Sequence, residues 1–210
     1  LEDVEKDGPR FIASDIEETL NGLSFTVHDT QIGNQEAFTT AVVGEHNVTN
    51  ILLATAIAVN QGMTLTDVAF QVRMLQPAES RLVRQTTAQG ITIINDAYSA
   101  NPVGVVSALK VLAMHNSGRR LLITPGMVEL GNLHDQENRK LGQVAAKYAT
   151  DIILVGEQQT HPIKLGLEDS NFPPDHVQVV DTLSEAINWY QQNLKSGDTV
   201  LFLNDLPDTY

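Results

Sequence analysis

Residues 91–102 read Ile-Thr-Ile-Ile-Asn-Asp-Ala-Tyr-Ser-Ala-Asn-Pro, and this stretch indicates the class of fold. Its first part, residues 91–95, is rich in β-branched side chains and predicts a short strand. Asn101-Pro102 predicts a helix that begins at Pro102, because asparagine is a good cap residue and proline suits the first helical position. A strand that leads through a short polar loop into a helix is typical of an α/β fold.

The same alternation continues downstream of this stretch. Further strands are predicted at residues 82–87, 121–124, 151–155, 177–180 and 199–203. Further helices are predicted at residues 134–148, 162–167 and 183–193. Strands and helices alternating at this spacing indicate a mainly parallel sheet with helices on both faces. Ligands of such sheets bind at the carboxyl ends of the strands, so the residues that follow each strand are the candidates for chemistry.

The first part of the sequence follows a different pattern. Short alternating runs at residues 11–13, 23–27 and 37–43 are separated by Asn-Gly and Gly-Asn pairs, which predicts a small antiparallel sheet. Residues 51–59 are apolar nearly all round and predict a buried helix, and a second helix is expected from Leu65 to about Met74. Pro77 ends that helix. We therefore expect two domains, residues 1–78 and 79–210, the first an α+β piece.

Composition excludes several classes of protein. The chain of 210 residues carries 13 basic and 26 acidic side chains, a net charge of −13, which disfavours nucleic acid and anionic membrane surfaces. Without cysteine there is no disulfide and no thiolate site. No apolar run approaches the roughly 20 residues of a membrane span, and the N-terminus lacks a signal-peptide pattern. We expect a cytoplasmic protein with no membrane insertion and no nucleic-acid partner.

Two asparagines open the apolar helix. Asn47 and Asn50 are three residues apart and share one face of its first turn, beside His46. A carboxamide offers a donor and an acceptor, which the edge of an adenine can match. Helix capping is the alternative, and on these residues alone it is favoured.

Asp96 and Arg81 are the next candidates. Asp96 follows the strand at residues 91–95, where a carboxylate can accept hydrogen bonds from two ribose hydroxyls, or can cap a turn or the following helix. Arg81 could bind a phosphate contributed by the preceding domain, although a lone arginine is more often solvated.

A shaped loop is expected at residues 124–131, because one proline and two glycines surround the strand end. Several motifs are missing from the sequence: a Gly-x-Gly-x-x-Gly fingerprint, a Gly-Lys-Thr or Gly-Lys-Ser phosphate loop, a His-Glu-x-x-His zinc motif and a Gly-x-Ser-x-Gly elbow. A self-contained hydrolase or zinc enzyme is therefore not expected.

Taken in order, four motifs resemble the Mur ligase family, and most closely the branch that adds D-alanyl-D-alanine to a UDP-muramoyl tripeptide. They are Gly44-x-His46-Asn47-x-x-Asn50, Arg81, Asp96-x-Tyr98-x-Ala100-Asn101-Pro102 and Met127-x-Glu129-Leu130-Gly131. The resemblance covers essentially the whole chain. It implies that residues 1–78 are the last part of a central ATPase domain and residues 79–210 a C-terminal Rossmann-like domain.

The resemblance also implies roles for individual residues. Asn47 and Asn50 would bind adenine, with His46 beside them at the nucleotide. Arg81 would bind the nucleotide phosphates and Asp96 the ribose hydroxyls.

Tyr98, Asn101, Met127 and Glu129 are the candidates on the side of the incoming substrate. The resemblance places the phosphate-loop lysine, the Mg²⁺ ligands and a modified lysine upstream, so no catalytic or metal-binding residue is assigned here.

The implied reaction is an ATP- and Mg²⁺-dependent amide ligation in peptidoglycan precursor synthesis. A carboxylate becomes an acyl phosphate, which an amine then attacks. The partners would be small molecules, a UDP-muramoyl peptide and D-Ala-D-Ala or a related amine, and we expect a monomer. The fragment alone would be inactive.

The sequence departs from this branch mainly on the substrate side. It has Pro125-Gly126-Met127 where Gly-Asp-Met is usual, Ser99 where Asn is common, and Asn204-Asp205 where Lys-Gly-Ser is frequent. Two alternatives stay open: a ligase for a different amine, and a Mur-ligase-like module that binds a nucleotide or a partner without ligation.

Overall fold

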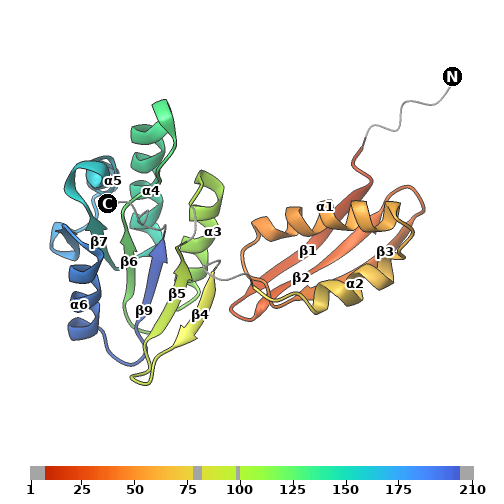
Figure 1. Cartoon of the computed structure of the whole chain (residues 1–210), viewed down its shortest axis with the longest axis horizontal. Helices are drawn as coiled ribbons and strands as arrows, with labels where there is room; N and C mark the ends of the chain where they lie inside the picture. The colour runs from red at the N-terminus through yellow and green to blue at the C-terminus, as the bar shows by residue number, and fades with distance from the viewer. Residues whose placement is uncertain (1–7, 78–81, 98–99, 204–210) are drawn as a thin grey trace. The chain divides into compact units, whose positions relative to one another are not determined.

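A computed structural model describes residues 8–77, 82–97 and 100–203. The chain divides into two compact units, Leu1–Pro77 and Ala78–Tyr210 (Figure 1). This division falls within one residue of the domain boundary expected from the sequence. No helix in the described ranges is long and apolar enough to cross a membrane.

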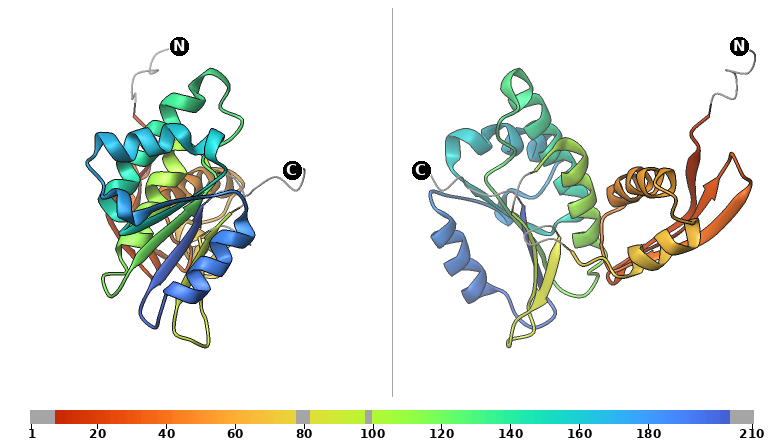
Figure 2. Two further views of the ribbon diagram at one scale, coloured as in Figure 1. Left: turned by 90° about the vertical axis from the view of Figure 1, so that its left-hand side faces the viewer. Right: turned by 45° about the vertical axis from the view of Figure 1, so that its right-hand side comes forward.

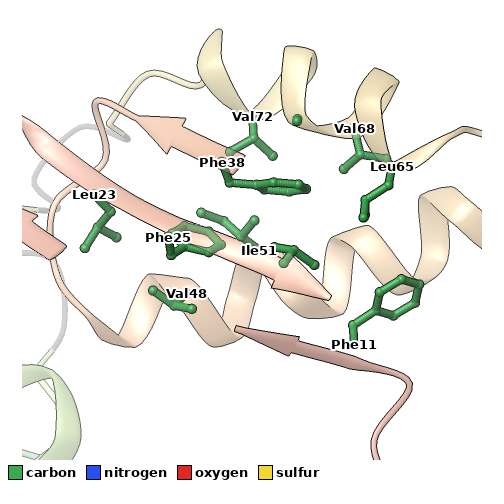
Figure 3. Close-up of a cluster of buried hydrophobic side chains, with 11 residues drawn as sticks. Phe11, Leu23, Phe25, Phe38, Val48, Ile51, Leu65, Val68 and Val72 are labelled. Carbon is green, nitrogen blue, oxygen red and sulfur yellow. The ribbon is translucent and has the colours of Figure 1, made fainter. Parts of the chain in front are cut away.

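The first unit is a three-stranded antiparallel sheet with two helices. Its strands are β1 (Phe11–Thr19), β2 (Gly22–Asp29) and β3 (Asn34–Thr40), and its helices are α1 (His46–Asn60) and α2 (Leu65–Arg73). Both helices pack against the sheet around Phe25 and Phe38, whose ring centroids lie 5.6 Å apart (Figure 3). The predicted antiparallel sheet is confirmed. Strands β1 and β2 are longer than the alternating runs indicated, and β3 begins and ends three residues earlier than its run.

An ion pair between the half-buried Arg10 and the buried Asp29 joins β2 to the start of β1. Arg10 Nη2 donates to Asp29 Oδ2 at 2.7 Å, and Asp29 is only 2% exposed. The hydrogen bonds from Arg10 hold the pKa of this carboxyl below its ordinary value, although desolvation acts in the opposite direction.

The prediction that α1 is buried on all sides is wrong for this unit. Val48, Ile51 and Thr55 face the sheet, but Leu53 is 62% exposed and Ile57 is 67% exposed. A helix that packs on one sheet buries only the stripe that faces it, so the rest of an all-apolar surface stays exposed.

The second unit is an α/β domain with a six-stranded sheet (Figure 1). Its elements in chain order are β4 (Val83–Thr86), β5 (Thr92–Asp96), α3 (Pro102–Ala113), β6 (Arg120–Thr124), η1 (Gly131–Leu133), α4 (His134–Tyr148), β7 (Asp151–Val155), α5 (Glu157–Asp169), η2 (Pro174–His176), β8 (Val177–Val180), α6 (Leu183–Asn193) and β9 (Thr199–Leu203). The strand order is β4-β5-β9-β6-β7-β8, with β4 antiparallel to β5 and the other pairs parallel. The predicted mainly parallel sheet is confirmed.

Helices cover both faces of this sheet, as predicted. Side chains of α6 pack with Leu121, Ile123 and Val200 on one face, while α3, α4 and α5 lie on the other (Figure 2). The predicted start of α5 is too late, because the helix begins at Glu157 and contains Pro162 as its sixth residue. Pro162 is buried, so tertiary packing outweighs the local penalty of proline inside a helix.

Two glycines bring α4 and α5 into backbone contact. A Cβ on Gly142 would collide with the carbonyl oxygen of Ile163, and one on Gly166 would collide with that of Arg139. Any side chain at either position would push the helices apart, so this contact sets the position of α4 against α5.

A buried carboxylate fastens β9, the strand that lies between β5 and β6. Asp198 is 1% exposed, and its two oxygens accept hydrogen bonds from the Arg119 and Lys195 amides, each at 2.8 Å. Its carbonyl oxygen also accepts from the Thr92 amide at 2.9 Å. Asp198 therefore joins the entrances of three strands that are distant in sequence.

We predict that Asp198→Ala destabilises the second unit by roughly 2–3 kcal/mol, because two main-chain amides lose a charged acceptor that is itself buried. The exposed Asp175→Ala should change stability by less than about 0.5 kcal/mol. Urea unfolding gives the free energy of unfolding of each variant. Hydrogen exchange of the β5, β6 and β9 amides shows whether the loss of protection is located at these strands. Equal effects at the two positions would contradict the proposed fastening.

Candidate functional site

The carboxyl ends of β5, β9 and β6 meet at one edge of the sheet. Asp96 of β5 pairs with Leu203 of β9, and Phe202 pairs with Ile123 of β6. Thr124, the last residue of β6, therefore lies at the same level as Asp96, two strand spacings or about 10 Å away. The loops that follow Asp96 and Thr124 open at the same edge, as expected from the sequence.

Asp96 is held at this edge by the main chain. Its Oδ1 accepts a hydrogen bond of 3.3 Å from the Leu82 amide, and its side chain is partly buried. The alternative that Asp96 caps the following helix is wrong, because Asn101 is the cap of α3. Its role as a ligand of ribose hydroxyls stays a prediction.

Asn101 has a clear structural task. Its Oδ1 accepts from the Val103 amide at 3.1 Å and from the Gly104 amide at 2.9 Å, while Pro102 takes the first helical position. The predicted start of α3 is confirmed. The side-chain oxygen of Asn101 is already occupied by the two hydrogen bonds that cap this helix.

Two predicted site residues, Tyr98 and Arg81, lie outside the described residues, as does the segment that carries Asn204 and Asp205.

The loop after β6 is compact and carries one exposed acid. Thr124 Oγ1 accepts from the Gly126 amide at 3.0 Å, and Gly126 has a φ of 89°. Met127 is 1% exposed, so its side chain belongs to the core and its main chain shapes the loop. Glu129 is exposed and has a φ of 60°, a left-handed conformation unusual for glutamate. Of the two candidates in this loop, Glu129 is the one whose side chain reaches solvent.

Asn138 holds this loop through hydrogen bonds to its main chain, and it was not among the residues predicted from the sequence. It lies in α4 with 0% exposure, and its Oδ1 accepts from the Met127 amide at 2.8 Å. Its Nδ2 donates to the carbonyl oxygens of Met127 at 2.9 Å and His134 at 3.1 Å. A signal was available, since Asn138 is the polar member of a face shared with Leu141 and Ala145.

In the first unit, the asparagines at the start of α1 are linked to each other. Asn47 Nδ2 donates to the Val43 carbonyl oxygen at 2.8 Å, and Asn50 Nδ2 donates to Asn47 Oδ1 at 3.0 Å. The cap of α1 is Glu45, without a side-chain cap bond, so the capping alternative is wrong for both asparagines. Asn50 is exposed at the outer end of this pair, and His46, the first residue of the helix, is half-buried beside it.

No group of three or more His, Asp or Glu side chains in residues 8–77, 82–97 and 100–203 could hold a metal ion. A groove of about 230 Å³ lies between α3 and α4 and is lined by Pro102, Met127 and Lys140 among others.

Comparison with known proteins points to one family. Residues 80–204 match the family described as Mur ligase, glutamate ligase domain. The chain is 31% identical over 189 residues to the UDP-N-acetylmuramoyl-tripeptide--D-alanyl-D-alanine ligase of Haemophilus influenzae, and 26% identical over 190 residues to that of Bacillus subtilis. Each alignment covers 90% of this chain and 40% of the relative, so the chain spans about two fifths of their length.

Solved structures agree with this comparison. A crystal structure of MurF from Acinetobacter baumannii aligns with a TM-score of 0.78 and 26% identity, covering 97% of this chain and 43% of that one. MurF ligase from Thermotoga maritima in complex with ADP aligns with a TM-score of 0.74 at 15% identity, over 95% of this chain and 44% of that one, which supports the fold alone. Since the family match covers more than half of the 210 residues, this chain belongs to the Mur ligase family.

Proposed function

We propose that the chain is part of an ATP-dependent ligase that adds D-alanyl-D-alanine to a UDP-muramoyl tripeptide in peptidoglycan precursor synthesis. The observation that carries the proposal is the 31% identity to a ligase of that name over 90% of the chain. The arrangement at the sheet edge supports the proposal. Asp96 and the loop that carries Glu129 lie at the same edge of the sheet, with β9 between their strands.

The two units correspond to two domains in this proposal. The first unit is the end of a central ATPase domain and the second is the C-terminal domain, within which the family match begins at residue 80. The exposed apolar face of α1 supports the first assignment. A groove of about 560 Å³ is lined there by Phe11, Leu52, Leu53, Ala56 and Ile57 among others, and the preceding part of the full-length protein would cover it.

The nucleotide would be bound by groups from both units. The exposed amide of Asn50, oriented by Asn47, offers a donor and an acceptor to adenine, with His46 beside it. Asp96 would accept from the ribose hydroxyls, and Arg81 would bind phosphate. The Mg²⁺ ligands and the phosphate loop would lie upstream.

ATP supplies the phosphoryl group in this reaction. The muramoyl-peptide carboxylate attacks the γ-phosphorus to give an acyl phosphate and ADP, and the amine then attacks the acyl carbon and expels phosphate. Glu129 is the exposed anion of the substrate-side loop and suits the ammonium group of a dipeptide. Tyr98, Asn101 and the main chain at Met127 complete the substrate-side candidates.

The direct test is phosphate release by the full-length protein with ATP, Mg²⁺, UDP-muramoyl tripeptide and D-alanyl-D-alanine. We expect turnover with this pair and none from the 210-residue chain alone. Turnover only with another amine would favour the alternative ligase. No turnover with any muramoyl acceptor, together with retained nucleotide binding, would favour the binding module.

Asp96→Ala in the full-length protein should raise the KM for ATP by roughly 10- to 100-fold, because a carboxylate that accepts from two hydroxyls is lost. The KM for the dipeptide should change less than twofold. Asp181→Ala is the matched control, since Asp181 is an exposed acid that follows β8 of the same sheet. Steady-state kinetics with each substrate varied checks this, and an unchanged nucleotide KM would remove Asp96 from the ribose role.

Leu53→Gln tests the proposed covering of α1. In the 210-residue chain the change should cost less than about 0.5 kcal/mol of stability, because Leu53 is 62% exposed. In the full-length protein it should cost about 2 kcal/mol, the value of burying a leucine. Ile51→Gln, at a buried position of the same helix, should destabilise both forms. If Leu53→Gln lowered the free energy of unfolding by the same amount in both forms, the proposed covering of α1 would be contradicted.

A further inference from the structure

We propose that Asn138 is a positioning residue for the incoming amine, acting through the loop that carries Glu129. This inference rests on the proposed ligase function. It concerns a residue that touches only the protein and sets the conformation of the substrate-side loop.

One amide side chain holds both ends of this loop. At the first end, Asn138 Oδ1 accepts from the Met127 amide at 2.8 Å and Nδ2 donates to the Met127 carbonyl oxygen at 2.9 Å. At the second end, the same Nδ2 donates to the His134 carbonyl oxygen at 3.1 Å. Residues 128–133 therefore form a span whose two ends are fixed to one buried group. Glu129 lies inside that span.

The chemistry of these contacts suits a carboxamide. Met127 presents a donor and an acceptor, so the facing side chain must accept with one atom and donate with the other. Aspartate would keep the acceptor and place a second oxygen against two carbonyl oxygens. Leucine would leave the buried amide and carbonyl of Met127 without this partner, which is costly at a site with 0% exposure.

Gly126 leaves the room that this arrangement needs. A Cβ at this position would lie 2.8 Å from Asn138 Oδ1 and 3.1 Å from Ile163 Cδ1, and the φ of 89° disfavours any side chain there. Asn138 is itself fixed in place, because the glycine contact between α4 and α5 involves Arg139 and Gly142, one and four residues later. The position of the loop is therefore set by the packed helices α4 and α5.

The consequence for the site is a preset direction for Glu129. Its φ of 60° is an unfavourable conformation for glutamate, and such conformations persist when their surroundings fix them. The fixed loop would hold the Glu129 carboxylate at the edge formed by the carboxyl ends of the strands before the amine binds. A displaced loop would weaken amine binding while leaving the nucleotide side in place.

The test compares Asn138→Asp with Gln136→Glu in the full-length enzyme. Both changes convert an amide of α4 to a carboxylate, but Gln136 is exposed. We expect Asn138→Asp to lower kcat/KM for the amine by about 10- to 100-fold with the KM for ATP within twofold. Gln136→Glu should leave both constants within twofold.

A second variant, Gly126→Ala, changes the loop side of the contact between Asn138 and Met127. Gly126→Ala should give the same selective loss for the amine, since its Cβ displaces Asn138 Oδ1. Hydrogen exchange of the Met127 amide in the 210-residue chain gives a readout that needs no activity. This exchange should accelerate at least about tenfold in Asn138→Leu and stay unchanged in Gln136→Glu.

The outcomes separate the two proposals. Absence of turnover by the unsubstituted full-length protein refutes the ligase function. Turnover by that protein with equal losses for ATP and amine in Asn138→Asp and Gly126→Ala overturns the positioning role, because a merely structural residue would act on both. Unchanged exchange at Met127 in Asn138→Leu also overturns it.

Discussion

The second unit depends on the insertion of β9 between β5 and β6. Without this strand the sheet would be two separate pieces, and the ends of β5 and β6 would not share an edge. Asp198 fastens the insertion on both sides, because its side chain accepts from the Arg119 amide before β6 and its carbonyl oxygen accepts from the Thr92 amide of β5. The distance between Asp96 and the loop after β6 is therefore set by a strand that belongs to neither of them.

Buried polar side chains shape the candidate site from outside it. Asp198 organises the strand entrances at one end of the sheet, and Asn138 organises a loop at the other. Both satisfy main-chain groups that would otherwise be costly to bury. The exposed residues with which a ligand would interact, such as Glu129, depend on these internal contacts for their placement. Substitutions at buried polar positions should thus affect function without touching a ligand.

Local sequence was sufficient for most elements and for the class of fold. The Asn101-Pro102 pair marked the start of α3 correctly, because capping is a local interaction. The position of β9 and the exposure of Leu53 depend on contacts between distant segments, which a periodic pattern does not encode. Asn138 was overlooked although it interrupts an apolar helix face, and its partners were not predictable because they are main-chain atoms of a loop.

The order of strands also bears on how the protein is made. β9 is the last strand of its sheet to leave the ribosome, so β5 and β6 must wait during synthesis with adjoining edges unpaired. Unpaired apolar strands of this kind are prone to aggregate. The first unit, whose strands pair with neighbours in sequence, has no such delay. Nascent chains should therefore depend most on chaperones in the interval between the synthesis of β6 and that of β9.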